Sequence, residues 1–202
     1  MKYVFTFLFI SLFLTVSSQR KINKANDVSF DSLLILKGNQ SKGKVFTEFS
    51  LSNGTSSISN RSFMGKITFL NFWFKACPPC IAEMRALNEL YAKLHIDKNF
   101  QFLSLTFENE KTISEMKKKY HIQYPVFNTS KDNCYKLNQG NGFPTSIIID
   151  DKGVIVFLLS GYNTDPVKAY QVLFSKFYPP LKNLLNNIGH KKSKESKYID
   201  HL

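Results

Sequence analysis

The feature that most constrains this chain is a run of β-branched and aromatic residues that leads into two closely spaced cysteines. Residues 67–74 show no alternation of polar and apolar side chains, which is typical of a strand buried on both faces. Cys77 and Cys80 follow, separated by two prolines. Apolar residues then recur at steps of three and four, as on one face of a helix. The sequence therefore predicts that the cysteines lie where a buried strand passes into a helix over about residues 78–96.

This position favours a reactive thiol. The first amides of a helix lack internal partners, and the helix dipole favours negative charge there. We therefore expect the pKa of Cys77 to lie below the value of about 8.5 for a free cysteine. Pro78 and Pro79 fit the first turn because they have no amide hydrogen to satisfy. Cys80 lies further along the helix, so the pair combines an accessible nucleophile with a shielded partner, as thiol–disulfide exchange requires.

Two other uses of a Cys-x-x-Cys pair remain open. A zinc site needs four ligands, and beyond the pair the chain offers Cys134 and four scattered histidines (His95, His121, His190 and His201). A purely structural disulfide would normally close a longer loop, because a short ring restricts the unfolded chain little. Redox chemistry is favoured over both, and neither a metal nor another cofactor is expected.

The ends of the chain differ in composition from its middle. Residues 3–16 form an uncharged apolar run behind Lys2, and small residues follow. This pattern predicts a signal peptide over residues 1–18. An uncleaved N-terminal anchor is the alternative, although such a run is short for a helix that spans a bilayer. Residues 19–43 are expected to form an extension with one edge strand over 33–36 and residues 44–178 one domain. Residues 179–202 are expected to form a basic tail that is partly disordered at its end.

The pattern of elements indicates an α/β sandwich with a mixed sheet. Residues 46–51 and 57–59 predict a hairpin around Asn53-Gly54, a favoured turn sequence. Further strands are expected over residues 100–107, 124–128, 146–150 and 154–159, and further helices over residues 111–120 and 166–177.

The chain is basic, with 27 Lys and Arg against 15 Asp and Glu and a net charge of +12. Much of the excess lies in lysine clusters at residues 117–119 and 191–194. Aromatic residues are not interleaved with these lysines as a nucleic-acid surface would require. The lysines are therefore interpreted as solvated faces, and no nucleic-acid partner is expected.

Three motifs occur together: Asn-Phe-Trp-Phe-Lys-Ala-Cys-Pro-Pro-Cys over residues 71–80, the pair Glu83-Met84, and Gly-Phe-Pro-Thr over residues 142–145 before a strand that ends at Asp150. Together they resemble the thioredoxin fold, and more narrowly the exported TlpA/ResA-like thiol–disulfide oxidoreductases of bacteria. The similarity covers about residues 44–178. It implies a thioredoxin-like sandwich with an N-terminal β-hairpin and an inserted helix–strand unit over about residues 109–128.

The resemblance implies roles for the cysteines and for the loop before residue 145. Cys77 matches the nucleophile of the family and Cys80 its resolving thiol. Pro144 matches a proline that is cis and faces the disulfide. The backbone of Phe143 would then pair with an extended segment of the substrate.

Trp73 and Pro78, next to the cysteines, are also expected to contact the substrate. Glu83 matches a carboxylate of TlpA/ResA-like members. It lies three residues after Cys80, so the two side chains share one flank of the helix. Partial burial would raise the pKa of this carboxyl group and let it exchange a proton with the Cys80 thiol. The alternative is an acid that only complements the helix N-terminus.

The chain also departs from the pattern. Asn71 stands where ordinary thioredoxins have a buried aspartate, so it cannot accept a proton. Ala76 replaces a tryptophan that is common before the first cysteine, and Arg85 replaces a proline. These changes leave the family assignment in place but make substrate preference harder to infer.

The resulting prediction is an exported, periplasmic reductase of protein disulfides. The family suggests apocytochrome c as a substrate and a membrane thiol donor that reduces the protein again. A thioredoxin-fold peroxidase is an alternative, but no Thr lies three residues before Cys77. A copper-delivery protein is another, but such relatives space their cysteines by three and add a distant histidine. Cys134 is expected to be a spare, half-buried thiol, and a regulatory or mixed-disulfide role is the alternative.

Overall fold

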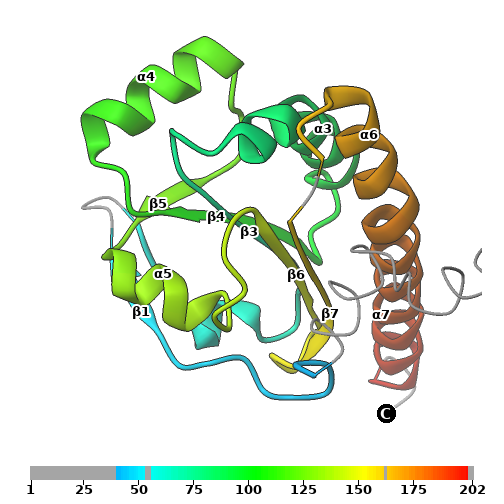
Figure 1. Cartoon of the computed structure of the whole chain (residues 1–202). Coiled ribbons are helices and arrows are strands. Elements are labelled where there is room, and N and C mark those ends of the chain that lie inside the picture. The colour runs from blue at the N-terminus through cyan, green and yellow to red at the C-terminus, as the bar shows by residue number, and fades with distance from the viewer. Residues whose placement is uncertain (1–39, 53–55, 162, 200–202) are drawn as a thin grey trace, which may run out of the picture. The chain divides into compact units, whose positions relative to one another are not determined.

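The computed structural model describes residues 40–52, 56–161 and 163–199, with side chains described up to residue 192. Its centre is a mixed five-stranded sheet in the order β5-β4-β3-β6-β7 (Figure 1). β3, β4 and β5 run parallel, whereas β6 is antiparallel to β3 and β7 is antiparallel to β6. The strands are β3 (Ile67–Trp73), β4 (Phe100–Thr106), β5 (Val126–Asn128), β6 (Thr145–Ile149) and β7 (Ile155–Ser160).

β3 lies in the middle of the sheet, and all seven of its residues are buried. Successive side chains of a strand point to opposite faces, and those of β3 divide accordingly. Phe69 and Trp73 belong to one apolar cluster, while Leu70 and Phe72 belong to the other. Both faces of β3 are therefore covered, which confirms the prediction of a strand buried on both faces.

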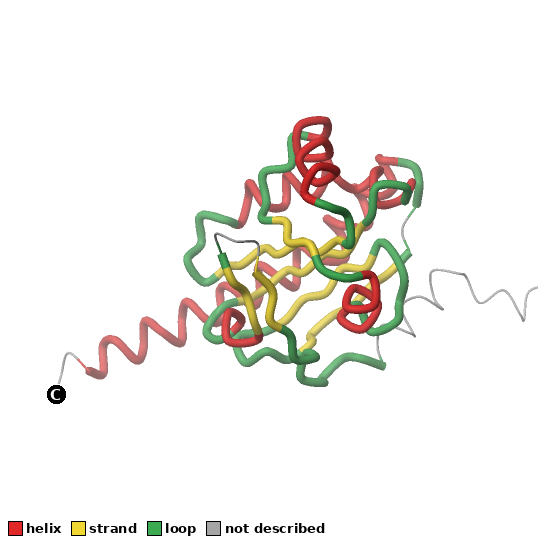
Figure 2. Tube along the Cα trace, turned by 90° about the vertical axis from the view of Figure 1, so that its left-hand side faces the viewer, coloured by secondary structure: helices red, strands yellow, loops and turns green. Residues whose placement is uncertain are grey.

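Helices cover both faces of this sheet, and Figure 2 shows them around the strands. The face of Trp73 packs against α3 (Pro78–Leu94), α4 (Glu110–Tyr120), α6 (Pro166–Val172), the π-helical segment η2 (Leu173–Phe177) and α7 (Tyr178–Ile199). The face of Leu70 packs against β1 (Ser50–Ser52), β2 (Ser57–Ser59), the 3-10 helix η1 (Asn60–Phe63) and α5 (Lys131–Leu137). The fold is thus the mixed α/β sandwich that the sequence predicted.

Most predicted elements are present. β1 and β2 pair antiparallel as the expected hairpin, although its turn at residues 53–55 lies outside the described residues. The inserted helix–strand unit is also confirmed, as α4 and β5. The predictions for residues 1–18 and for an edge strand over 33–36 concern residues that the structure does not describe. α5 was not predicted.

The C-terminal segment is a helix where the sequence predicted a basic tail outside the domain; residues 200–202 lie outside the described residues. Residues 178–199 form the 22-residue helix α7, which follows η2 directly along the chain and is labelled in Figure 1. Leu181, Leu185 and Ile188 are buried in the cluster on the α3 side of the sheet. Because these residues recur at steps of three and four, one face of α7 is apolar and belongs to the core. None of the helices in the described ranges is both long and apolar enough to cross a membrane.

Candidate active site

The two cysteines lie at the junction of β3 and α3, as predicted. Cys77 is the N-cap residue of α3, and the helix begins at Pro78. A disulfide joins Cys77 to Cys80, with an S–S distance of 2.07 Å and a Cα–Cα distance of 5.2 Å. The backbone N–H of Cys80 donates to the sulfur of Cys77 over 3.3 Å. An amide of the first helical turn therefore points at the sulfur of Cys77, where it can stabilise negative charge.

The exposure of the cysteines differs from the expectation. In the disulfide form Cys77 is only 3% exposed and Cys80 is fully buried. Both belong to the apolar cluster between α3 and the sheet, together with Met84. The expected contrast between an accessible and a shielded thiol is therefore small while the two sulfurs are bonded.

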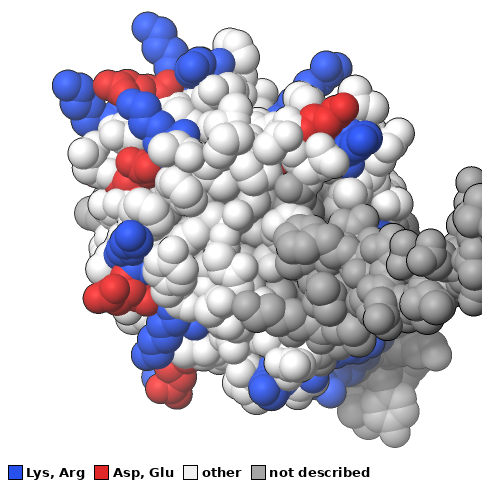
Figure 3. All heavy atoms as spheres, in the orientation of Figure 1, with Lys and Arg blue, Asp and Glu red and all other residues white. Residues whose placement is uncertain are grey.

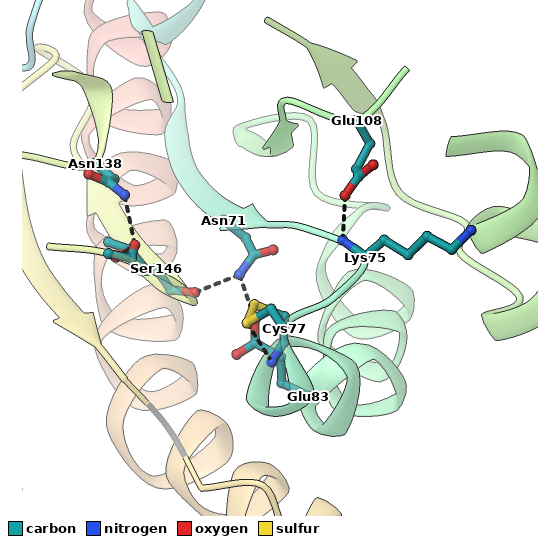
Figure 4. Close-up of a disulfide and its surroundings, with 10 residues drawn as sticks. Asn71, Lys75, Cys77, Glu83, Glu108, Asn138 and Ser146 are labelled. Atoms are coloured by element: carbon teal, nitrogen blue, oxygen red, sulfur yellow. Dashed lines mark hydrogen bonds between the residues drawn. A yellow bond between two sulfur atoms is a disulfide. The ribbon is translucent and has the colours of Figure 1, made fainter. Parts of the chain in front are cut away.

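A buried polar group lies beside the disulfide (Figure 4). The side-chain amide of Asn71, on β3, donates to Oε1 of Glu83 over 2.8 Å and to Oγ of Ser146 over 3.1 Å. Glu83 is completely buried on α3. Burial raises the pKa of Glu83 to about 8, and the hydrogen bond from Asn71 opposes part of this rise. The direction of the shift agrees with the sequence prediction, and the burial is more complete than predicted.

Three oxygens around this group have no hydrogen-bond partner in the described structure: Oε2 of Glu83, Oδ1 of Asn71 and the hydroxyl of Tyr124. Burial, together with the nearby charge of Glu83, raises the pKa of Tyr124. An ionised carboxylate with one unpaired buried oxygen is costly. The environment therefore favours the protonated, neutral form of Glu83 until the pH approaches 8.

The loop before β6 adopts the conformation that the family resemblance implied. The peptide bond between Phe143 and Pro144 is cis. The carbonyl of Gly142 accepts hydrogen bonds from the Asn138 amide over 2.7 Å and from the Thr145 hydroxyl over 2.8 Å. The loop is thus tied to α5 on one side and to β6 on the other. Phe143 itself remains half-buried.

Of the two other residues expected to contact substrate, only Pro78 is exposed. Trp73 is 1% exposed, and its indole N–H donates to Oγ of Ser104 over 2.9 Å. The alternation of β3 explains this burial, since Trp73 points to the same side as Asn71, beneath α3. Trp73 therefore supports the site from the core, and its burial argues against the expected contact.

The loop between β3 and α3 is held by acidic residues that the sequence did not single out. The backbone N–H of Lys75 donates to Oε1 of Glu108 over 2.7 Å, as Figure 4 shows. The ammonium group of Lys75 pairs with Glu115 of α4 over 3.3 Å. Glu108 follows β4, the parallel neighbour of β3, so the ends of both strands meet at this edge of the sheet. The position of Glu108 directly after the predicted strand next to β3 could have identified it as a residue near the cysteines.

Cys134 does not join the pair. It lies on α5 and is buried in the apolar cluster on the opposite face of the sheet. It was expected to be half-buried, but it is completely buried. Burial raises the pKa of its thiol to about 12, which makes it a poor nucleophile.

The comparisons with known proteins agree with this geometry. The Redoxin family matches residues 40–173. A thiol-disulfide oxidoreductase ResA from Bacillus thuringiensis subsp. konkukian is 32% identical over 108 residues, which cover 53% of this chain and 62% of that protein. The match thus spans less than two thirds of the relative's length.

Solved structures share the fold. A candidate thioredoxin from Neisseria meningitidis is 27% identical, with a TM-score of 0.57 and coverage of 72% of this chain and 93% of that one. A thioredoxin family protein from Chlorobium tepidum, titled a thiol:disulfide interchange protein, is 21% identical, with a TM-score of 0.52 and coverage of 71% and 97%. The resemblance to TlpA/ResA-like proteins is therefore confirmed, and this chain belongs to the Redoxin family.

Proposed function

We propose that this protein is an exported thiol–disulfide oxidoreductase that reduces protein disulfides through Cys77 and Cys80. One observation carries the proposal: the Cys77–Cys80 disulfide caps the first turn of α3, and the buried carboxyl group of Glu83 lies on the next turn. The similarity to a relative named thiol-disulfide oxidoreductase supports the reaction type.

The first step uses the reduced form. The thiolate of Cys77, stabilised at the helix N-terminus, attacks one sulfur of a substrate disulfide. The substrate S–S bond breaks, a mixed disulfide forms with Cys77, and the second substrate sulfur leaves as a thiolate. That thiolate takes up a proton from solvent.

The second step releases the product. The thiol of Cys80 gives its proton to the carboxylate of Glu83, and the resulting thiolate attacks the sulfur of Cys77. The Cys77–Cys80 bond forms, and the remaining substrate sulfur leaves as a thiolate. Two electrons have passed from the cysteine pair to the substrate. With a pKa of about 8, Glu83 can both accept and return a proton near neutral pH.

The remaining parts of the proposal concern partners and location. The substrates are disulfide-containing polypeptides, for which the family suggests apocytochrome c. A membrane thiol donor reduces the Cys77–Cys80 pair again, since an oxidising compartment would otherwise leave it as a disulfide. The apolar run over residues 3–16 supports export to the periplasm.

A stoichiometric reduction assay tests the function. The protein is reduced with dithiothreitol, separated from it, and mixed with insulin; the new insulin thiols, two for each disulfide reduced, are then alkylated and counted by mass spectrometry. We expect about one disulfide reduced per protein molecule, and none with Cys77→Ala. The same preparation is tested for hydrogen peroxide consumption and bound copper. Rapid peroxide consumption without insulin reduction would favour the peroxidase, and bound copper without it the copper-delivery protein.

A further inference from the structure

The buried hydroxyl of Tyr124 has no part in the proposed mechanism as described so far. Tyr124 lies in the loop before β5, within the inserted helix–strand unit, and is 1% exposed. Its ring stacks on Phe102 of β4, with the ring centroids 4.5 Å apart, and lies edge-on to Tyr91 of α3 at 6.4 Å. Within the described part of the chain, its hydroxyl makes no hydrogen bond. A buried hydroxyl without a partner is costly and therefore calls for an explanation.

The loop that carries Tyr124 is held from both sides. The backbone N–H of Gln123 donates to Oδ1 of Asn88 on α3 over 3.1 Å. The backbone N–H of Ser104 on β4 donates to the carbonyl of Pro125 over 3.0 Å. Because the residues before and after Tyr124 are fixed to α3 and to β4, its ring has a fixed place between that helix and the sheet.

The hydroxyl of Tyr124 lies within electrostatic reach of Glu83. Burial raises the pKa of Tyr124, and so does the charge of Glu83. Asn88, which holds the loop, follows Glu83 by five residues on α3, or about 7.5 Å along the helix axis. Because its pKa is raised, the hydroxyl keeps its proton at neutral pH and remains a hydrogen-bond donor.

The three unpartnered oxygens of this region differ in what they can do. When Glu83 is ionised, its Oε2 can only accept a hydrogen bond, and Oδ1 of Asn71 can likewise only accept one. Of the three, only the hydroxyl of Tyr124 carries a hydrogen to donate. A hydrogen bond to a charged group is stronger than one between neutral groups. Oε2 of the ionised Glu83 is therefore the acceptor that matches this donor.

The other groups around Glu83 are uncharged or point to solvent. β3 and β6 contribute the uncharged side chains of Asn71 and Ser146, and α6 and η2, which also pack against α3, contribute apolar side chains. The lysines of α4 at residues 117–119 are exposed. Figure 3 shows basic side chains standing out from the surface at the upper left, where Figure 1 places α4. In the described ranges, the titratable groups that face Glu83 are thus Tyr124 and the cysteine pair.

We propose that Tyr124 is a positioning residue for the resolving step and that, in the reduced protein, its hydroxyl donates a hydrogen bond to Oε2 of Glu83. The bond holds the carboxylate in its ionised form, ready to accept the proton of Cys80. That proton passes from Sγ of Cys80 to the carboxylate, and Tyr124 keeps its own. The described disulfide form lacks this bond, so the bond is specific to the reduced protein. This inference rests on the proposed function and adds a residue to its second step.

Tyr124→Phe tests the bond, because it removes one oxygen and keeps the ring on Phe102. The reduced protein is labelled with ¹³C at the glutamate carboxyl carbons, and the Glu83 signal, identified by its absence in Glu83→Gln, is followed by NMR between about pH 5 and 10. We expect the midpoint in Tyr124→Phe to lie about one pH unit above that of the unchanged protein. Such a difference is a tenfold change in the ionisation constant, or about 1.4 kcal/mol, near the lower end for a hydrogen bond to a charged group.

The resolving step gives a second measurement. Below the midpoint of Glu83, Tyr124→Phe should resolve the mixed disulfide with Cys77 about tenfold more slowly than the unchanged protein, because a smaller fraction of Glu83 is ionised. The two rates should converge at high pH, where the carboxylate is ionised in both proteins. A residue that only supports the fold would lower the rate at every pH, and thermal unfolding shows whether the variant remains folded.

Tyr91→Phe is the matched control. Tyr91 is half-buried on α3, and its ring packs against that of Tyr124. Its hydroxyl is not among the unpartnered buried oxygens of the described structure. The variant removes the same atom from the same aromatic group, so it should leave both the midpoint of Glu83 and the rate profile unchanged.

The results separate this inference from the function on which it rests. Equal midpoints in a folded Tyr124→Phe protein and in the unchanged protein would overturn the inference and leave the reductase in place. An equal displacement in Tyr91→Phe would overturn it too, because it would reflect a general disturbance of the aromatic group. If the midpoint moves only in Tyr124→Phe but insulin is not reduced, the hydrogen bond is supported and the proposed function fails. If Tyr124→Phe does not fold, the ¹³Cζ signal of Tyr124 in the unchanged reduced protein decides: it should change at the midpoint of Glu83, and a constant signal would overturn the bond.

Discussion

The side-chain amide of Asn71 donates a 2.8 Å hydrogen bond to the buried carboxyl group of Glu83. The bond joins the central strand β3 to α3 beside the disulfide (Figure 4). Where ordinary thioredoxins carry a buried aspartate on the strand, this chain carries the acid on the helix and its hydrogen-bond donor on the strand.

Replacing Glu83 with Gln should slow the resolving step because Cys80 loses its proton acceptor. In the unchanged protein the rate should rise with pH through about 8, as Glu83 ionises. In Glu83→Gln the rate should be lower and nearly flat over this part of the profile, between about pH 6 and 9. Stopped-flow decay of the mixed disulfide measures the step. An unchanged pH profile would mean that Glu83 only complements the helix N-terminus.

Glu83 should also make stability depend on pH. Its pKa is about 8 in the folded protein, against 4.5 for an ordinary glutamate side chain. Between these two pH values the folded state therefore binds more protons than the unfolded state. The free energy of unfolding should therefore fall as pH rises through this window, by up to about 1.4 kcal/mol per unit. Urea unfolding at pH 5 and 8 should show a smaller fall in Glu83→Gln, and equal falls would contradict the assigned pKa.

Asn71 should determine the pH at which the rate of the resolving step rises. Its hydrogen bond lowers the pKa of Glu83, so Asn71→Ala should move the rise in rate to higher pH. Ser146→Ala is the control, because it removes the other acceptor of the Asn71 amide and leaves the bond to Glu83. A profile that moves equally in both variants would indicate a general disturbance of the core.

The sequence predicted the elements with clear periodicity and missed those without it. β3 and α3 follow from one long apolar run and one helical repeat. α5 has only seven residues and mostly exposed side chains, so its sequence resembles a loop. α7 was missed because two prolines near its start and many lysines are not typical of a core helix. Its apolar face in the core has only three buried residues, Leu181, Leu185 and Ile188. The π-helical segment η2 leads directly into that helix.

The candidate active site was also predicted only in part. The positions of Cys77 and Cys80 follow from a local motif, whereas the Asn71–Glu83 bond depends on how α3 packs against β3. Trp73 was expected to contact the substrate because it adjoins the motif, although the same sequence predicted a strand buried on both faces. The alternation of the strand points its side chain toward α3, where it is buried in the disulfide form.

The reduction potential should lie on the reducing side. Two prolines separate the cysteines, and no histidine is present there of the kind found in strong oxidants. Equilibration with glutathione buffers should give about −200 mV or lower. A value near that of the strong oxidants, about −120 mV, would reverse the proposed direction of electron flow.

The most direct test of the account is the order in which the two cysteines react. The sulfur of Cys77 accepts a hydrogen bond from a backbone N–H of the first helical turn, whereas Cys80 is fully buried. Cys80→Ala should therefore still attack substrates but fail to release them, so that mixed disulfides through Cys77 accumulate. These are counted after acid quenching, alkylation and non-reducing electrophoresis. Cys77→Ala should trap few partners. If Cys77→Ala traps as many as Cys80→Ala, the assigned roles are wrong.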